Sequence, residues 1–237
     1  MKSNGQFYKG GHFIGNMQDY NEFASILTSY VTFAKNNGLT VTQLGVQNEP
    51  DQNQPYPSAL WTAREFHDFI PYLYSALGKA GYAATKILFP EPSGWSIDYG
   101  GFAGATMADA LVAPYVGVLG MHAYRGSVVA PTNYGYGQRV WQTEASSTAQ
   151  PFDGSIDDAL NWARTIHSYL TTARVNAWLH FIVTNEGPLG VDDNEGLTDQ
   201  IGNVAKYLRD GTLEQICSSR LADGSSFKYQ IIADYSI

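Results

Sequence analysis

The sequence predicts an α/β fold in which helices alternate with the strands of a parallel sheet. Strand-like and helix-like segments follow one another along most of the 237 residues, as they do when helices connect parallel strands. Hydrophobic residues make up 44% of the chain and charged residues 15%, which predicts a globular domain with a sizeable core and excludes disorder. No internal repeat or low-complexity linker marks a second domain.

The first elements are two helices separated by a strand. Residues 19–36 place apolar side chains at helical spacing and run into a glycine, which is a typical helix stop. Residues 40–47 alternate aliphatic or β-branched residues with polar ones and predict a strand. Ser58 is the predicted N-cap of a helix that continues to Gly78.

The rest of the chain keeps the alternation until about residue 209. We expect strands at 86–90, 116–124, 137–143 and 176–183, and helices at 107–112, 155–173 and 197–209. Residues 91–105 are rich in Gly, Pro and Ser and predict a long functional loop. Residues 210–237 depart from the pattern and contain one expected edge strand, 227–232. The chain thus has about five strand-and-connection units, whereas a closed (β/α)8 barrel has eight.

Two glutamates follow predicted strands and suggest a catalytic pair. Pro50 favours an extended conformation for Glu49 and ends the strand there, while Glu144 follows the strand at 137–143. The carboxyl ends of parallel barrel strands share one face, so these residues can meet although they are distant in the chain. Two carboxyl groups can serve as acid and nucleophile in glycoside cleavage, with retention of configuration if they lie ~5 to 5.5 Å apart.

Several other classes of function are disfavoured. A net charge of -8 without a basic run excludes nucleic acid and anionic membrane surfaces as natural partners. No apolar stretch reaches ~18 residues, and no Gly-rich phosphate loop supports a nucleotide-binding domain. The five His and the single Cys217 show no metal-ligand spacing, so we expect neither a metal nor another cofactor.

Two motifs carry a resemblance to a known family. Residues 47–50 (Gln-Asn-Glu-Pro), with 56–62 downstream, and residues 141–144 (Trp-Gln-Thr-Glu) resemble glycoside hydrolase family 30, a family of retaining (β/α)8 enzymes. The match runs from residue 1 to about 209, and residues 1–5 resemble the stretch after the third barrel strand. The resemblance therefore implies an incomplete TIM barrel with strands four to eight, as a catalytic domain at 1–209 followed by a tail of unknown role at 210–237.

The resemblance also implies roles for individual residues. Glu49 would be the acid/base after the fourth strand and Glu144 the nucleophile after the seventh. Asn48 would bond the 2-hydroxyl of the sugar, and His122 and Tyr124 would lie at the tip of the sixth strand, where the tyrosine can orient the nucleophile.

Aromatic side chains are the remaining candidates for sugar binding. Aromatic residues make up 14% of the chain and suit the apolar faces of sugar rings, although an aromatic-rich core is an equally ordinary explanation. Tyr56, Trp95 and Trp178 are the candidate platforms, and His180 and Phe181 compete with Trp178 for the eighth-strand aromatic of the family. Glu91, which also follows a strand, is interpreted as a loop-stabilising residue.

These observations predict a retaining hydrolase of β-linked glycosides or polysaccharides. The alternative is a non-catalytic carbohydrate-binding remnant or an inactive fragment, because part of the wall of the site is not encoded. An open sheet leaves unpaired edges, so we expect either a homodimer through those edges or a longer native chain. Residues 1–5 lack the apolar core of a signal peptide, whereas the resemblance implies secretion of the full-length enzymes.

Overall fold

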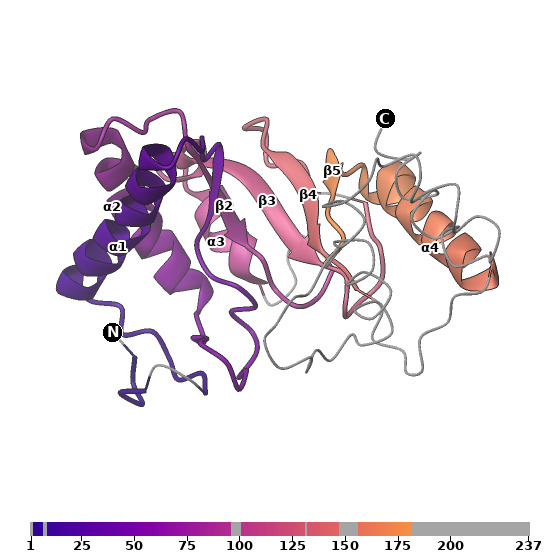
Figure 1. Cartoon of the computed structure of the whole chain (residues 1–237), viewed down its shortest axis with the longest axis horizontal. Coiled ribbons are helices and arrows are strands. Elements are labelled where there is room, and N and C mark those ends of the chain that lie inside the picture. The colour runs from indigo at the N-terminus through magenta and orange to yellow at the C-terminus, as the bar shows by residue number, and fades with distance from the viewer. Residues whose placement is uncertain (1, 7–8, 96–100, 131, 147–155, 182–237) are drawn as a thin grey trace, which may run out of the picture. The chain divides into compact units, whose positions relative to one another are not determined.

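Figure 1 shows the computed structural model of the chain. The structure describes residues 2–6, 9–95, 101–130, 132–146 and 156–181. The predicted helix at 197–209, the predicted strand at 227–232 and the predicted domain boundary after residue 209 lie outside these residues. Two compact units divide the chain, one formed by residues 1–143 with 175–177 and the other by residues 144–174 with 178–237.

A five-stranded sheet follows the order of the chain, β1-β2-β3-β4-β5. The strands are β1 (Gln43–Gly45), β2 (Lys86–Pro90), β3 (Val116–His122), β4 (Arg139–Glu144) and β5 (Ala177–Trp178). Both β1 with β2 and β2 with β3 pair in parallel, with Leu44 opposite Ile87 and Leu88 opposite Val118. Neighbouring strands that follow one another in sequence and run parallel confirm the predicted α/β class.

Strand β1 is shorter than the predicted strand at 40–47, but hydrogen bonding to β2 continues on both sides of it. Thr42 accepts a bond from the backbone N–H of Lys86 (2.9 Å), and Val46 donates to the carbonyl of Leu88 (3.2 Å). For the predicted strand at 176–183, of which residues 182 and 183 lie outside the described residues, β5 likewise covers only Ala177–Trp178 of the described part. The alternation of residue types therefore located both segments correctly and overestimated the regular part of each.

Two long helices, α1 (Met17–Asn36) and α2 (Ala63–Lys79), belong to the first unit. The predicted N-cap of α2, Ser58, is wrong. Thr62 caps the helix, and its hydroxyl and the carboxylate of Glu65 form a reciprocal capping box. The start is displaced because Leu60 exchanges backbone hydrogen bonds with Gly11 (2.8 Å) and Phe13 (3.0 Å), which keeps this stretch extended.

Two shorter helices, each followed by a short helical turn, lie later in the described residues. Helix α3 (Phe102–Ala108) begins earlier than the predicted helix at 107–112 and is followed by the 3-10 turn η2 (Ala113–Tyr115). In the second unit, α4 (Ile156–Ser168) continues into the π-helical turn η3 (Tyr169–Ala173), as predicted for 155–173. No helix of the described residues combines the length and hydrophobicity needed to cross a bilayer.

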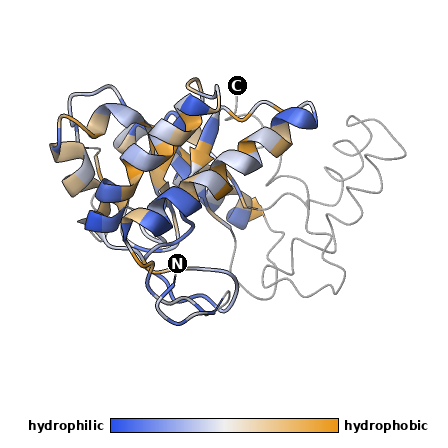
Figure 2. Ribbon diagram, turned by 90° about the vertical axis from the view of Figure 1, so that its left-hand side faces the viewer, coloured by the Kyte–Doolittle hydropathy of each residue, from blue (hydrophilic) through white to orange (hydrophobic). Residues whose placement is uncertain are grey.

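The core of the first unit lies where α2 packs over the sheet. The buried face of α2 carries Phe66, Phe69, Ile70, Leu73 and Leu77, all at most 1% exposed. Figure 2 shows the corresponding pattern, with hydrophobic strands behind helices that carry both hydrophilic and hydrophobic stretches. This core fixes the strands, and with them the loops at the carboxyl ends of β1, β2 and β3.

Candidate active site

Glu49 lies just beyond the carboxyl end of β1 with a left-handed backbone conformation, φ 45°. The expectation that Pro50 would make this residue extended is therefore wrong. Its N–H donates to the carbonyl of Glu91 (3.0 Å), and its carbonyl accepts from the N–H of Gln52 (2.9 Å). These two bonds hold Glu49 in a region that non-glycine residues seldom occupy.

The side chain of Glu49 is buried, at 5% exposed for the residue, and both carboxyl oxygens have a polar neighbour. Oε1 lies 3.1 Å from Nδ1 of His122, and Oε2 accepts a bond from Nε2 of Gln54 (2.5 Å). Because His122 is only 1% exposed, the contact with Oε1 is shielded from water, and it forms a hydrogen bond when one of the two groups carries a proton. The Glu49 carboxyl group is thus held in one orientation.

Gln54 contributes to this site and was not among the residues predicted from the sequence. It lies in an irregular loop, and neither periodicity nor a motif distinguishes it from the neighbouring polar residues. The Ser58 hydroxyl anchors its backbone by donating to the Gln54 carbonyl (3.2 Å), while Ser58 itself accepts from Gly10 N–H (3.1 Å).

His122 and Tyr124 lie where β3 ends, as the sequence predicts. Their rings are 6.0 Å apart and nearly perpendicular, at 80°. Their backbone N–H groups donate to Pro92 (3.0 Å) and Ser93 (3.2 Å), so the chain beyond β2 stays paired with the chain beyond β3. This extended pairing fixes the position from which His122 reaches Glu49.

Asn48 and Tyr56 form an exposed pair next to Glu49 in the chain. Nδ2 of Asn48 lies 3.5 Å from the hydroxyl of Tyr56, which is 44% exposed as a residue. Both side chains are accessible, as contact with a ligand requires.

Glu144, Trp95 and Trp178 are the other predicted site residues. Trp95 is 2% exposed and belongs to the core. Glu144 is the last residue of β4 and, like Trp178, belongs to the second unit, where the Trp178 ring is 5.0 Å from that of Tyr169. The roles given to Trp95, Trp178 and Glu144 stay predictions.

Glu91 connects three strands through its backbone. Its N–H donates to Gly120 (3.0 Å) and its carbonyl accepts from Glu49 (3.0 Å). The carboxylate lies over Gly45, where an added Cβ would come within 2.4 Å of Oε2. This bonding suits the loop-stabilising role expected from the sequence.

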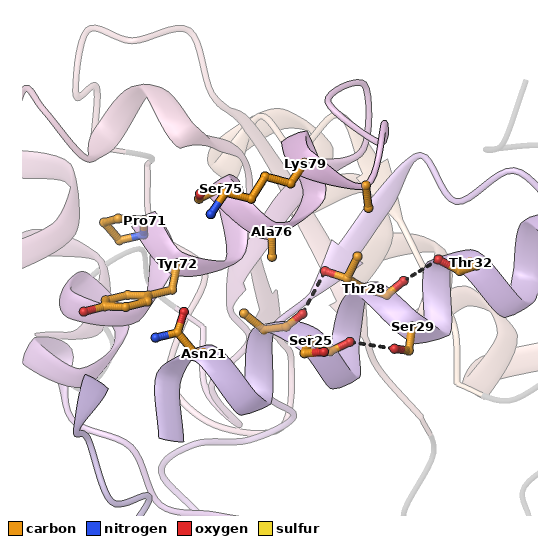
Figure 3. Close-up of a pocket in the computed structure, with 12 residues that line it drawn as sticks. Asn21, Ser25, Thr28, Ser29, Thr32, Pro71, Tyr72, Ser75, Ala76 and Lys79 are labelled. Atoms are coloured by element: carbon orange, nitrogen blue, oxygen red, sulfur yellow. Dashed lines mark hydrogen bonds between the residues drawn. The ribbon is translucent and has the colours of Figure 1, made fainter. Parts of the chain in front are cut away.

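A groove between α1 and α2 is separate from these residues (Figure 3). Its volume is about 680 Å³, and hydroxyl groups line much of it. The hydroxyls of Thr28 and Ser29 donate to carbonyls of their own helix, those of Ala24 (2.7 Å) and Ser25 (2.8 Å). None of the predicted site residues lines this groove.

Comparison with known proteins relates the chain to xylan-degrading enzymes. No protein-family model matches it. It is 25% identical to glucuronoxylanase XynC of Bacillus subtilis (strain 168) over 220 residues, which cover 86% of this chain and 49% of that protein.

Solved structures agree with this similarity. The family 30 subfamily 8 xylanase Xyn30A from Clostridium acetobutylicum superposes with a TM-score of 0.67 at 27% identity, covering 77% of this chain and 45% of that one. The catalytic domain of family 30 xylanase C from Talaromyces cellulolyticus gives a TM-score of 0.66 at 27% identity, covering 78% and 45%. The chain spans about half the length of the curated relatives it matches. Over that half, the chain is related to glycoside hydrolase family 30.

Proposed function

We propose that the chain carries the acid/base and nucleophile of a retaining glycoside hydrolase. The observation that supports this most directly is the buried contact between Glu49 and His122 at the carboxyl ends of β1 and β3. Burying a carboxyl group is costly unless it is hydrogen-bonded. Glu49 also lies beyond the carboxyl end of a parallel strand, where (β/α)8 enzymes have their active sites. The similarity to family 30 enzymes supports glycoside hydrolysis as the reaction, and that reaction needs a carboxyl group in a fixed position.

Glu49 acts in the proposal as general acid and then as general base. It first gives its proton to the glycosidic oxygen as the bond to the anomeric carbon breaks, while Glu144 attacks that carbon and forms a glycosyl-enzyme. Glu49 then takes a proton from water, whose oxygen attacks the same carbon and releases Glu144. The two displacements retain the configuration of the sugar, and no cofactor takes part.

The placement of Glu144 at the end of β4 supports its role as nucleophile. Thr143, the residue before it, extends its hydroxyl toward the carbonyl of Met121, the residue before His122 (3.4 Å). Strands β3 and β4 are neighbours in the sheet, and in a parallel barrel the residues that end such strands project on one face.

Xylan is the first substrate to test, because three relatives with 25–27% identity are named xylanases or glucuronoxylanases. Asn48 and Tyr56 are exposed beside Glu49 and are proposed to contact the sugar, with Asn48 bonding its 2-hydroxyl. Tyr124 is proposed to orient Glu144, and Trp95 and Trp178 keep their proposed place in the wall of the sugar site.

The test is hydrolysis of xylan, glucuronoxylan and a panel of aryl β-glycosides by the chain and three variants. Glu144→Gln and Glu49→Ala should each remove nearly all hydrolysis, whereas Glu22→Gln, on the exposed side of α1, should leave it unchanged. Full activity of Glu144→Gln would refute the assigned nucleophile.

The second candidate is binding of carbohydrate without turnover, which the exposed pair of Asn48 and Tyr56 also suits. Affinity electrophoresis in xylan gels separates the two functions. Retarded migration of the wild-type chain, with no product from any glycoside, would favour the binding protein over the hydrolase.

A further inference from the structure

The loop after Glu49 is tied to the loop after β2 by one carboxylate, that of Asp51. Oδ1 of Asp51 accepts from the N–H of Ser93 (2.8 Å), and Oδ2 accepts from the Ser93 hydroxyl (2.5 Å) and from Nε2 of Gln52 (2.7 Å). Burial alone would raise the pKa of Asp51, but the bonds from Ser93 and Gln52 bring it below its ordinary value. The carboxylate is therefore charged at neutral pH and a strong acceptor.

Ser93 is a firm anchor for this bond. It is 2% exposed, and its carbonyl accepts from the N–H of Tyr124 (3.2 Å). The residue before it, Pro92, accepts from the N–H of His122 (3.0 Å). Asp51 thus attaches the loop after β1 to the strand end that carries His122.

These contacts close a ring around the proposed acid/base. Glu49 is two residues from Asp51 in the chain, Asp51 binds Ser93, and the 92–93 segment binds the backbone of His122, whose imidazole contacts Glu49. The left-handed conformation of Glu49 is sparsely populated and persists only where the surroundings fix it. On the C-terminal side of Glu49, the bonds of Asp51 to Ser93 add to this fixation, beside the bond from the N–H of Gln52 to the Glu49 carbonyl (2.9 Å).

We propose that Asp51 is a positioning residue that acts through Glu49, holding the carboxyl group of the acid/base where it protonates the leaving group. The inference rests on the proposed function. Asp51 does not touch substrate in this proposal. Its loss displaces Glu49 by a fraction of an ångström to an ångström, which is enough to weaken proton transfer.

The experiment compares Asp51→Ala with the wild type on two aryl β-glycosides of the sugar that the wild type cleaves. One has an activated leaving group, such as 2,4-dinitrophenol, and departs without protonation. The other has a poor leaving group and depends on the acid. We expect kcat/KM on the poor leaving group to fall about 10- to 100-fold, with a much smaller loss of kcat/KM on the activated one, because kcat/KM reports only the first displacement, in which Glu49 acts as the acid.

Two further variants separate positioning from general destabilisation. Asp51→Asn keeps one oxygen for the N–H of Ser93 and should recover part of the loss. Asp109→Asn is the matched control, since Asp109 also accepts from a loop N–H, that of Leu111 (2.8 Å), but lies outside the ring. It should not alter the dependence on the leaving group, whatever it does to thermal stability.

Each outcome decides between the proposals. Equal losses on both leaving groups, or an unchanged Asp51→Ala, would overturn the positioning role while leaving the hydrolase intact if Glu49→Ala is inactive. A wild type that cleaves no glycoside would overturn the proposed function, and this inference with it.

Discussion

Nδ1 of His122 lies 3.1 Å from Oε1 of Glu49, although 73 positions separate the two residues in the chain. The contact joins the ends of β1 and β3, which are not adjacent strands, across the end of β2. Both residues are buried, so a change in either one is felt by the other.

Replacement of His122 by phenylalanine should impair both folding and activity. The variant leaves Oε1 of a buried carboxyl group without its imidazole partner, a loss that costs about 1–3 kcal/mol of the free energy of unfolding. Urea unfolding measures the loss. His122→Asn, which keeps a polar group, should be less destabilised, and equal stability of wild type and His122→Phe would contradict the role of the contact.

The capping box of α2 predicts a stability change far from the candidate site. Thr62→Ala removes the hydroxyl that accepts from the N–H of Glu65 and should lower the free energy of unfolding by about 1 kcal/mol. Thr62→Ser keeps the hydroxyl and should stay close to the wild type. The urea midpoint measures the stability of both variants. A Thr62→Ala variant as stable as the wild type would show that the cap does not contribute to the free energy of unfolding.

His67 predicts a dependence of stability on pH. Its Nδ1 lies 2.8 Å from Asp68 and its Nε2 3.0 Å from Asp109, so both nitrogens donate only when the ring is protonated. The bond to Asp68, opposed by partial burial and aided by Asp109, raises the pKa of His67 above its ordinary value. The stabilisation is complete below about pH 6.5, the value in the unfolded chain, and is lost as pH rises through the higher folded pKa.

Thermal melts of wild type and His67→Gln between pH 5.5 and 8.5 test this dependence. The difference in melting temperature between them should shrink as the pH rises. Asp109 acts in the opposite direction: the N–H of Leu111 and the His67 ring lower its pKa, so its contribution is lost only in acid. A difference that grows with pH would refute the assignment.

Replacement by alanine should change the free energy of unfolding in opposite directions at two glycines. A Cβ at Gly126 would lie 2.9 Å from the backbone oxygen of Trp95 at φ 76°, so Gly126→Ala should destabilise the chain by more than about 1 kcal/mol. Gly78 lies within α2 with open space around the added atom, so Gly78→Ala should stabilise it by roughly 0.5–1 kcal/mol. Urea unfolding gives the free energy of unfolding of both variants. A Gly126→Ala variant as stable as the wild type would show that the loop can shift to accommodate the added Cβ.

An edge strand of the described sheet predicts association. Among the described strands β1 has a neighbour on one side only, β2, and α1, which precedes β1 in the chain, exposes apolar side chains, with Met17 at 70% and Phe33 at 66%. Light scattering should give twice the mass of one chain if edges pair, whereas a clean monomer with cooperative thermal unfolding would contradict pairing.

The sequence predicted the elements well because their periodicity reports burial directly. Strand β2 occupies the predicted residues, and α1 starts two residues before its predicted range and ends with it. The start of α2 was misplaced because the partners of Leu60 lie near the N-terminus, and periodicity contains no information on such distant bonds.

The candidate site was predictable only where a motif marks it. The motif containing Glu49 and the pattern of His122 and Tyr124 located residues that the structure brings together. Gln54 was not predicted, because its bond to Glu49 depends on the path of an irregular loop. The left-handed conformation of Glu49 was not predicted either, because the preference for an extended conformation before Pro50 is weaker than two backbone hydrogen bonds.

The stacking of Trp61 on Phe13, with ring centroids 4.1 Å apart and planes within 5° of parallel, gives the first unit an optical reporter. Trp162 and Trp178 belong to the second unit, and replacing both by phenylalanine would leave the fluorescence to the indoles of the first. Emission would then report the melting of the first unit alone, including the release of Phe13 from Trp61.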